Sequence, residues 1–244
     1  MNLILLEDHE LANGQDVELR GARARHLIDV LHVVSGQEVR IGVLDGPQGT
    51  GVVTAVCTDR VRLKCTFDGA VPEVPAVDLL LALPRPKVMR RLWAQLAALG
   101  VGRIILTNAE RVEREYFDAH VLTPATFVPL LIEGLQQARD TRLPVVSIHR
   151  RFRVLIEDEL DGMAGAATRV VAHPATTTML RDVIRSARGP RVLIAVGPEG
   201  GWNTFELELL QAHGFATIGI GTRTLRTDTA CVALLSLVHD ALAT

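Results

Sequence analysis

Residues 73–244 alternate between short apolar runs and longer segments of helical periodicity, and this alternation constrains the fold more than any other feature of the sequence. Such an alternation predicts a mostly parallel β-sheet with helices on both faces, an α/β architecture. The predicted strands are Val77–Leu83, Arg103–Thr107, Pro144–Ser147, Arg169–Ala172, Arg191–Val196 and Ala216–Ile220. The predicted helices are Lys87–Leu99, Pro124–Arg139, Thr176–Arg188, Asn203–His213 and Asp228–Ala243.

Residues 1–72 follow a different pattern, which predicts a separate, smaller β-rich domain. A glycine-rich turn at 45–49 separates two β-branched runs, as in a hairpin, and prolines at 72 and 75 are typical of a linker. We therefore predict two domains, 1–72 and 73–244. The predicted elements of the first are strands at Leu3–Glu7, Glu38–Leu44, Gly51–Val56 and Val61–Phe67 and a helix at Arg23–His32.

Composition limits the class of protein. With 48% apolar and 22% charged residues, the chain matches ordinary globular proteins and not disordered ones. No apolar stretch approaches the roughly 20 residues of a membrane span, and the first ten residues lack the features of a targeting segment. Three cysteines without CxxC spacing favour reduced thiols, and the histidines show no metal-ligand spacing. We expect a cytoplasmic protein without a metal ion or a membrane partner.

The charge distribution favours an RNA partner, although the net charge is only −2. Basic residues cluster in 84–114 and again in 139–153, and all but two of the 26 basic side chains are arginines. The planar guanidinium binds phosphate in a bidentate manner, which suits a nucleic acid. The alternative is that these clusters are merely solvated faces.

A glycine-rich segment, Gly197-Pro-Glu-Gly-Gly201, directly follows the predicted strand Arg191–Val196. Ligands of open α/β sheets bind at the carboxyl ends of strands, and glycines allow a close approach of the backbone. Asn203 and Glu206 have the spacing of a capping box at the start of the next helix. The segment predicts a ligand-binding loop, with a plain tight turn as the alternative.

A second loop follows the last predicted strand and contains Gly219, Gly221, Arg223 and Arg226 before the final helix. Free N–H groups at a helix start suit a carboxylate or the polar edge of a base. The sequence contains no phosphate-binding P-loop, no HExxH and no GxSxG motif, and it lacks the third glycine of a dinucleotide fingerprint.

These two loops together resemble the RsmE-type ribosomal RNA methyltransferases of the SPOUT superfamily, which methylate uridine N3 in small-subunit rRNA. The paired motifs are GPEGG and, after a helix, GFATIGIGTRTLRTDTA. Further similarities are Arg25-His26-Leu27, Leu83-Pro84 with Pro86-Lys87, and His173-Pro174, so the resemblance covers almost the whole chain.

The resemblance implies a PUA-like barrel, a SPOUT α/β domain with a C-terminal trefoil knot, and a homodimer. It also implies S-adenosylmethionine (AdoMet) as the cofactor. The implied AdoMet-binding residues are His173, Gly197, Pro198, Glu199, Gly200, Gly201, Ile220, Gly221, Leu225, Arg226, Thr229 and Ala230. The implied RNA partner is small-subunit rRNA, either free or in the assembled 30S subunit. The predicted RNA-binding residues are Arg23, Arg25, His26, Arg85, Lys87, Arg90, Arg111, Arg139 and Arg142.

Methylation of uracil N3 requires loss of its proton, which leaves negative charge on the carbonyl oxygens. A cation placed there lowers the barrier, and we predict this catalytic role for Arg226. The base is either Asp228, where the family usually has Glu, or water. The run Ala138-Arg139-Asp140 also departs from the usual Ser-Gly-Arg, so the target nucleotide is less well determined than the cofactor.

Two other functions are compatible with the sequence. The chain could be a SPOUT methyltransferase that acts on another rRNA or tRNA position, or a non-catalytic RNA-binding relative that keeps the knot as a scaffold. Retention of Gly200, Gly201 and Arg226 favours a catalytic protein, because a silent relative would be free to lose them.

Overall fold

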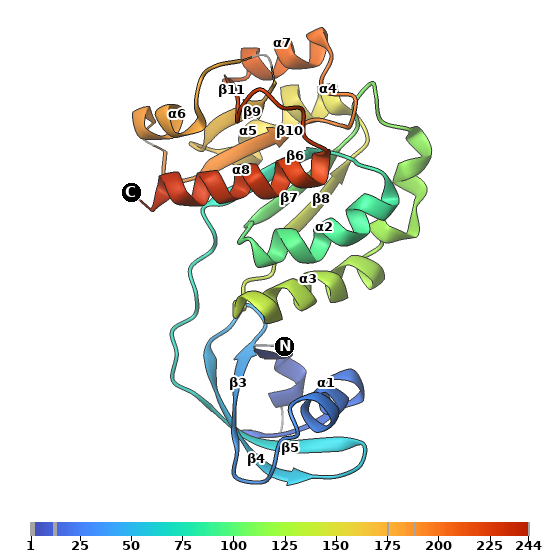
Figure 1. Ribbon diagram of the computed structural model, residues 1–244, viewed down its shortest axis with the longest axis vertical. Coiled ribbons are helices and arrows are strands. Elements are labelled where there is room, and N and C mark those ends of the chain that lie inside the picture. The colour runs from blue at the N-terminus through green and yellow to red at the C-terminus, as the bar shows by residue number, and fades with distance from the viewer. Residues whose placement is uncertain (1–2, 12–13, 175, 188, 244) are drawn as a thin grey trace. The chain divides into compact units, whose positions relative to one another are not determined.

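The computed structural model describes residues 3–11, 14–174, 176–187 and 189–243 (Figure 1). The chain forms two compact units, of which the first is Met1–Val74 together with Leu131–Leu143. The second unit is Pro75–Leu130 together with Pro144–Thr244. The segment 131–143, which the sequence alternation places with the second domain, therefore packs with the first unit.

The first unit is built on a five-stranded sheet with the order β1-β3-β4-β5-β2. Leucines, isoleucines and valines from alternate positions of these strands form its core, together with Leu27 from the π-helical turn His26–Val30 that follows α1 (Gly21–Arg25). A strand that the sequence analysis missed, β2, pairs antiparallel with β5 at the edge of the sheet. The strands are β1 (Ile4–Leu6), β2 (Asp16–Arg20), β3 (Glu38–Val43), β4 (Gln48–Val56) and β5 (Arg60–Phe67).

Hydrogen bonds explain why segment 131–143 packs with the first unit. Thr141 donates through Oγ1 to the carbonyl oxygen of Gly46 at 2.7 Å, and its own carbonyl accepts from the N–H of Asp45 at 2.8 Å. The guanidinium of Arg142 donates to the carbonyl oxygens of Pro72 and Asp45. The hairpin turn between β3 and β4 is thus hydrogen-bonded to residues about 95 positions further along the chain.

The second unit contains a six-stranded sheet with the order β11-β9-β10-β6-β7-β8, and every neighbouring pair is parallel. The central strands β6 and β10 are buried along their whole length, as expected of a parallel sheet covered on both faces. Asp78 is the polar exception in β6, and Arg191 pairs with it at 2.6 Å. The strands are β6 (Val77–Ala82), β7 (Arg103–Thr107), β8 (Val145–His149), β9 (Thr168–Ala172), β10 (Val192–Val196) and β11 (Ala216–Ile218).

Helices cover the sheet, and α2 and α8 lie side by side across one face (Figure 1). After α1 of the first unit, the α-helices are α2 (Pro86–Ala98), α3 (Pro124–Ala138), α4 (Phe152–Val154), α5 (Leu160–Ala164), α6 (Leu180–Ser186), α7 (Thr204–Ala212) and α8 (Thr227–Leu242). A π-helical turn, Leu155–Glu159, joins α4 to α5. None of the helices in the described ranges is long and apolar enough to cross a membrane. The three cysteines are free, as predicted.

Two helical segments differ from the prediction. The helical stretch 152–164 was not predicted, although Phe152, Leu155, Ile156 and Leu160 have helical spacing and are buried. The predicted helix Thr176–Arg188 begins only at Leu180, because Met179 is extended and forms a parallel bridge with Gly219. The residues before Leu180 therefore belong to a loop at the edge of the sheet.

Candidate functional site

Three neighbouring strands of the second unit end at the same edge of the sheet. Strand β9 lies between β10 and β11, all three are parallel, and each is followed by a loop. The loop after β9 begins at His173, the loop after β10 at Gly197, and the loop after β11 at Gly219. Ligands of open α/β sheets bind at such an edge, so these loops define the candidate site.

The loop after β10 is shaped by glycines and by the start of α7. The indole of Trp202 packs so closely that a Cβ on Gly197 would lie 3.1 Å from Nε1. Gly201 has φ +75°, which favours glycine. The predicted capping box is present, because the Asn203 side chain accepts from the Glu206 N–H and the Glu206 carboxylate accepts from the Asn203 N–H. The loop is therefore held firmly at its helical end.

The loop after β11 passes against the loop after β9. A Cβ on Gly219 would collide with the carbonyl oxygen of Thr176, and the N–H of Gly219 donates to the carbonyl of Thr178 at 2.9 Å. Gly221 has φ +129°, again a conformation that favours glycine. Only a residue without a side chain fits at Gly219, so this close crossing explains the glycine.

The start of α8 joins the two glycine-bearing loops. Thr227 is buried, and its Oγ1 donates a hydrogen bond to the carbonyl oxygen of Gly197 at 3.5 Å. Between the loops lies a cavity with about 910 Å³ of free space, its open mouth included. The two loops and the start of α8 thus enclose one cavity that opens to the solvent.

The cavity wall contains most of the residues that were predicted to bind the cofactor. They are His173, Gly197, Pro198, Glu199, Gly200, Gly201, Ile220, Gly221, Leu225 and Ala230. Two predicted residues, Arg226 and Thr229, are exposed and do not line the cavity. Trp202 also lines the cavity and was not predicted. Its position directly after the glycine-rich loop was the signal that could have identified it.

Arg111 is the unexpected member of the wall, because it was predicted to contact RNA. It follows β7, which lies two positions from β10 in the sheet. Its guanidinium donates to the carbonyl oxygen of Gly200, and a Cβ on Gly200 would lie 2.7 Å from Cδ of Arg111. The side chain of Arg111 therefore occupies the space that Gly200 leaves open.

Asp228 and Arg226 lie at the N-terminal end of α8. The Asp228 carboxylate pairs with Arg91 of α2 at 3.0 Å and accepts from the N–H of Thr229 at 2.9 Å. Arg226 is the residue immediately before the helix, and its backbone is extended. Both carboxylate oxygens of Asp228 thus have partners within the fold.

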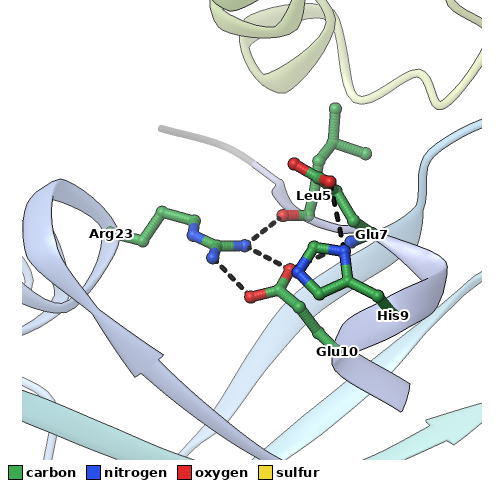
Figure 2. A network of polar contacts seen from close by, with 5 residues as sticks. All are labelled: Leu5, Glu7, His9, Glu10 and Arg23. Atoms are coloured by element: carbon green, nitrogen blue, oxygen red, sulfur yellow. Dashed lines mark hydrogen bonds and ion pairs between the residues drawn. The ribbon is translucent and has the colours of Figure 1, made fainter. Parts of the chain in front are cut away.

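Some residues that were predicted to bind RNA have partners within the first unit instead. Arg23 donates to the Glu10 carboxylate through both terminal nitrogens and to the carbonyl oxygen of Leu5 (Figure 2). Burial by itself raises the pKa of Glu10, but hydrogen bonds from Arg23 and the Glu7 N–H outweigh it, so the pKa lies below its usual value. Arg23 is consequently a structural residue of this unit.

His26 and Arg142 also differ from the prediction. Burial lowers the pKa of His26, and its Nε2 is buried without a hydrogen-bond partner among the described residues. Arg142 is bonded to the hairpin turn, as described above. The guanidinium of Arg139 is exposed, as are the side chains of Arg25, Arg85, Lys87 and Arg90. These five cations are the ones that remain available for a phosphate backbone.

The described ranges contain no group of three or more His, Cys, Asp or Glu side chains that could hold a metal ion. The wall of the candidate site combines glycines and apolar residues with His173, Glu199, Thr224 and Thr227 and with two arginines, Arg111 and Arg223.

Comparison with known proteins adds relatives of the whole chain. Residues 72–239 match the model of a family described as an RNA methyltransferase domain. A ribosomal RNA small subunit methyltransferase E from Treponema pallidum is 31% identical over 98% of this chain and 90% of its own length. A protein of the same name from Synechocystis is 29% identical over 91% of this chain and 72% of its own length.

Solved structures show the same fold. A ribosomal RNA small subunit methyltransferase E from Neisseria gonorrhoeae, bound to S-adenosyl methionine, superimposes with a TM-score of 0.78. The superposition covers 98% of this chain and 97% of that one, at 24% identity. A putative methyltransferase from Legionella pneumophila, in complex with the same cofactor, gives a TM-score of 0.74 at 24% identity and covers 99% of this chain and 98% of that one.

Proposed function

Because the chain belongs to the RNA methyltransferase family, and within it to the small subunit methyltransferase E group, we propose that it methylates N3 of a uridine in small-subunit ribosomal RNA. The methyl donor is AdoMet, and the predicted enzyme class agrees with the family. We propose N3 as the methylated atom because this chain shares two C-terminal motifs with enzymes that methylate uridine at N3.

The observation that supports this function best is the cavity between the two glycine-bearing loops. Its wall contains mainly glycines and apolar residues, with a few polar ones such as His173 and Glu199, which suits the adenosine and methionine parts of AdoMet. A Cβ on Gly200 or Gly219 would collide with Arg111 or Thr176, so the backbone itself forms the wall at these two positions. AdoMet supplies a methyl group that is activated by its bond to a sulfonium sulfur. The neutral thioether that leaves needs no acid to protonate it.

The residues proposed to hold AdoMet come from all three loops. His173 lies after β9, Gly197–Gly201 after β10, and Ile220, Gly221 and Leu225 after β11, with Ala230 in α8. Arg226 and Thr229 lie outside the wall, next to its members Leu225 and Ala230 in the chain. The protein mainly aligns the methyl group and the nucleophile in one line.

Arg226 is proposed to act on the RNA side of the site. Its neighbours Leu225 and Thr227 both line the cavity, while its own side chain is exposed at the helix start. From this position its guanidinium can stabilise the negative charge that forms on a uracil carbonyl oxygen when N3 loses its proton.

The finer architecture is also proposed. The curled five-stranded sheet of the first unit is compatible with a PUA-like barrel that binds RNA. The close crossing of Gly219 and Thr176 supports a trefoil knot, in which the C-terminal segment threads through the loop after β9. We also propose a homodimer with the uridine site near the interface, and the exposed apolar residues Leu237 and Leu242 of α8 are candidates for that interface.

A methylation assay with small-subunit RNA that lacks this modification tests the function. We expect incubation of free rRNA or 30S subunits with the protein and AdoMet to give one equivalent of 3-methyluridine, identified by mass spectrometry of nucleosides. Methylation at another nucleotide position would contradict the proposed target, and binding of RNA without any methyl transfer would identify a non-catalytic relative.

A further inference from the structure

Two arginines line the cavity, and they differ in how they are held. Arg223 is exposed and makes no hydrogen bond or ion pair with any described residue. Arg111 is also exposed, but its guanidinium donates to the carbonyl oxygen of Gly200 and its stem packs on the Cα of that glycine. Arg111 is thus the cation whose position at the cavity is defined by the fold.

The backbone next to Arg111 is fastened as well. The carboxylate of Glu206 is buried, with 3% of the residue exposed. Its Oε1 accepts from the N–H of Glu110 at 2.7 Å, and its Oε2 accepts from the N–H of Asn203 at 2.8 Å. Glu206 therefore ties the residue before Arg111 to the helix that follows the glycine-rich loop. The position of Arg111 relative to Gly200 is fixed through both its backbone and its side chain.

The charge of Arg111 is not neutralised by a neighbour. No carboxylate of the described residues lies within 4.0 Å of its guanidinium, whereas Arg23, Arg91, Arg150 and Arg153 all form ion pairs. A guanidinium has five N–H donors, and the hydrogen bond to Gly200 uses one nitrogen. The remaining donors of Arg111 have no hydrogen-bond partner among the described residues, so they can serve a ligand in the cavity.

A fixed cation with free donors is the arrangement that stabilises a charge formed during a reaction, because it needs no reorganisation at that moment. A phosphate contact does not require this rigidity, because its contribution comes mainly from the release of counterions and is independent of sequence. The placement therefore favours contact with the reacting base over contact with the RNA backbone.

We propose that Arg111 is a further catalytic residue, which donates hydrogen bonds to a carbonyl oxygen beside N3 of the target uracil. This inference rests on the proposed function. The proton on N3 passes to solvent water, and the electron pair it leaves forms the N–CH3 bond. The pair of the broken S–CH3 bond stays on sulfur, so S-adenosylhomocysteine is released. Arg111 holds the negative charge of the deprotonated uracil until the methyl group arrives.

The test compares Arg111→Gln with Arg114→Gln, a matched control that removes the same charge from the same segment, outside the cavity wall. We expect Arg111→Gln to lower the single-turnover methylation rate near pH 7 by about 100-fold to 1,000-fold. The affinities for S-adenosylhomocysteine and for RNA, measured by calorimetry and filter binding, stay within about threefold of wild type. Arg114→Gln keeps the wild-type rate.

The pH dependence of the rate separates a catalytic from a merely structural role. A cation beside the uracil lowers the apparent pKa of N3. Removal of the cation therefore raises the pH at which the rate reaches its plateau, by about one unit or more. Arg111→Lys keeps the charge without the planar fork and is expected to show a smaller shift. If the Gln variant melts well below wild type, the same comparison is made with the Lys variant.

Three results would overturn the inference. A rate loss matched by an equal loss of RNA affinity, with an unchanged pH profile, would make Arg111 a phosphate contact. A tenfold or larger loss of S-adenosylhomocysteine affinity would make it a cofactor ligand. A wild-type rate in Arg111→Gln would give it no role in the reaction. By contrast, a wild-type protein that binds no AdoMet would refute the proposed function itself, and the inference with it.

Discussion

The backbone of Gly219 packs directly against the carbonyl oxygen of Thr176. This oxygen lies so close that a Cβ at position 219 would collide with it. This contact holds the loop after β11 against the loop after β9, and both loops line the cavity. The shape of the proposed AdoMet site therefore depends on a single missing side chain, which a substitution can test.

Gly219→Ala is expected to weaken S-adenosylhomocysteine binding by at least tenfold, because the added methyl group forces the two loops apart. The measurement is calorimetric titration of both proteins. Gly162→Ala is the matched control, because Gly162 lies in α5 with open space around its Cα, and alanine favours the helix by up to about 1 kcal/mol. Wild-type affinity in Gly219→Ala would show that the cavity does not depend on this crossing.

The ion pair between Arg23 and Glu10 predicts a pH-dependent contribution to stability (Figure 2). The pKa of Glu10 lies below its ordinary value of 4.5, so the pair stabilises the folded state fully above that pH. The contribution is lost as the pH falls through the lower folded-state pKa. Urea unfolding of wild type and Glu10→Gln should therefore differ most near pH 7 and converge in acid.

Glu38→Gln provides the control for this comparison, because Glu38 is exposed at the start of β3. Its effect on the free energy of unfolding should be small throughout the pH range. A difference between wild type and Glu10→Gln that grew as the pH fell would contradict the lowered pKa.

Arg226→Ala is expected to lower the methylation rate by about 100-fold, while the affinity for AdoMet changes little. The reason is that Arg226 lies outside the wall of the cavity, and we propose that it acts on the RNA side of the site. Single-turnover rates and calorimetric titration measure the two effects separately. A large loss of AdoMet affinity would instead make Arg226 a cofactor ligand.

The exposed cations at the start of α2 are expected to contact the RNA backbone. Changing Arg85, Lys87 and Arg90 together to Gln should weaken RNA binding and reduce the slope of log K against log salt by about 0.7 to 0.9 per lost contact. AdoMet affinity should be unchanged. Arg153→Gln is the control, because Arg153 pairs with Glu157 on its own helical segment. An unchanged salt slope in the triple variant would place the RNA elsewhere.

The sequence was most informative where local pattern and chemistry coincide. The alternation after residue 73 predicted a parallel sheet, and all its observed strand pairs are parallel. The capping box of Asn203 and Glu206 was also confirmed, since it depends on residues three positions apart. The family and the use of AdoMet followed from two short motifs, and the comparisons agree with both.

Features that depend on distant contacts could not be predicted. Nothing local indicates that Thr141 bonds to Gly46, so the packing of segment 131–143 with the first unit was missed. The role of Arg111 at the cavity depends on the order of strands in the sheet, which periodicity does not encode. Strand β2 was missed because Asp16–Arg20 is rich in charged residues, which are exposed at its ends.

The most direct test is nucleoside mapping of small-subunit rRNA from cells in which this protein has been deleted. The rRNA should lack 3-methyluridine at one position, and a plasmid copy of the wild-type protein should restore it while Gly219→Ala does not. Small-subunit rRNA that keeps its full content of 3-methyluridine after the deletion would contradict the proposed reaction.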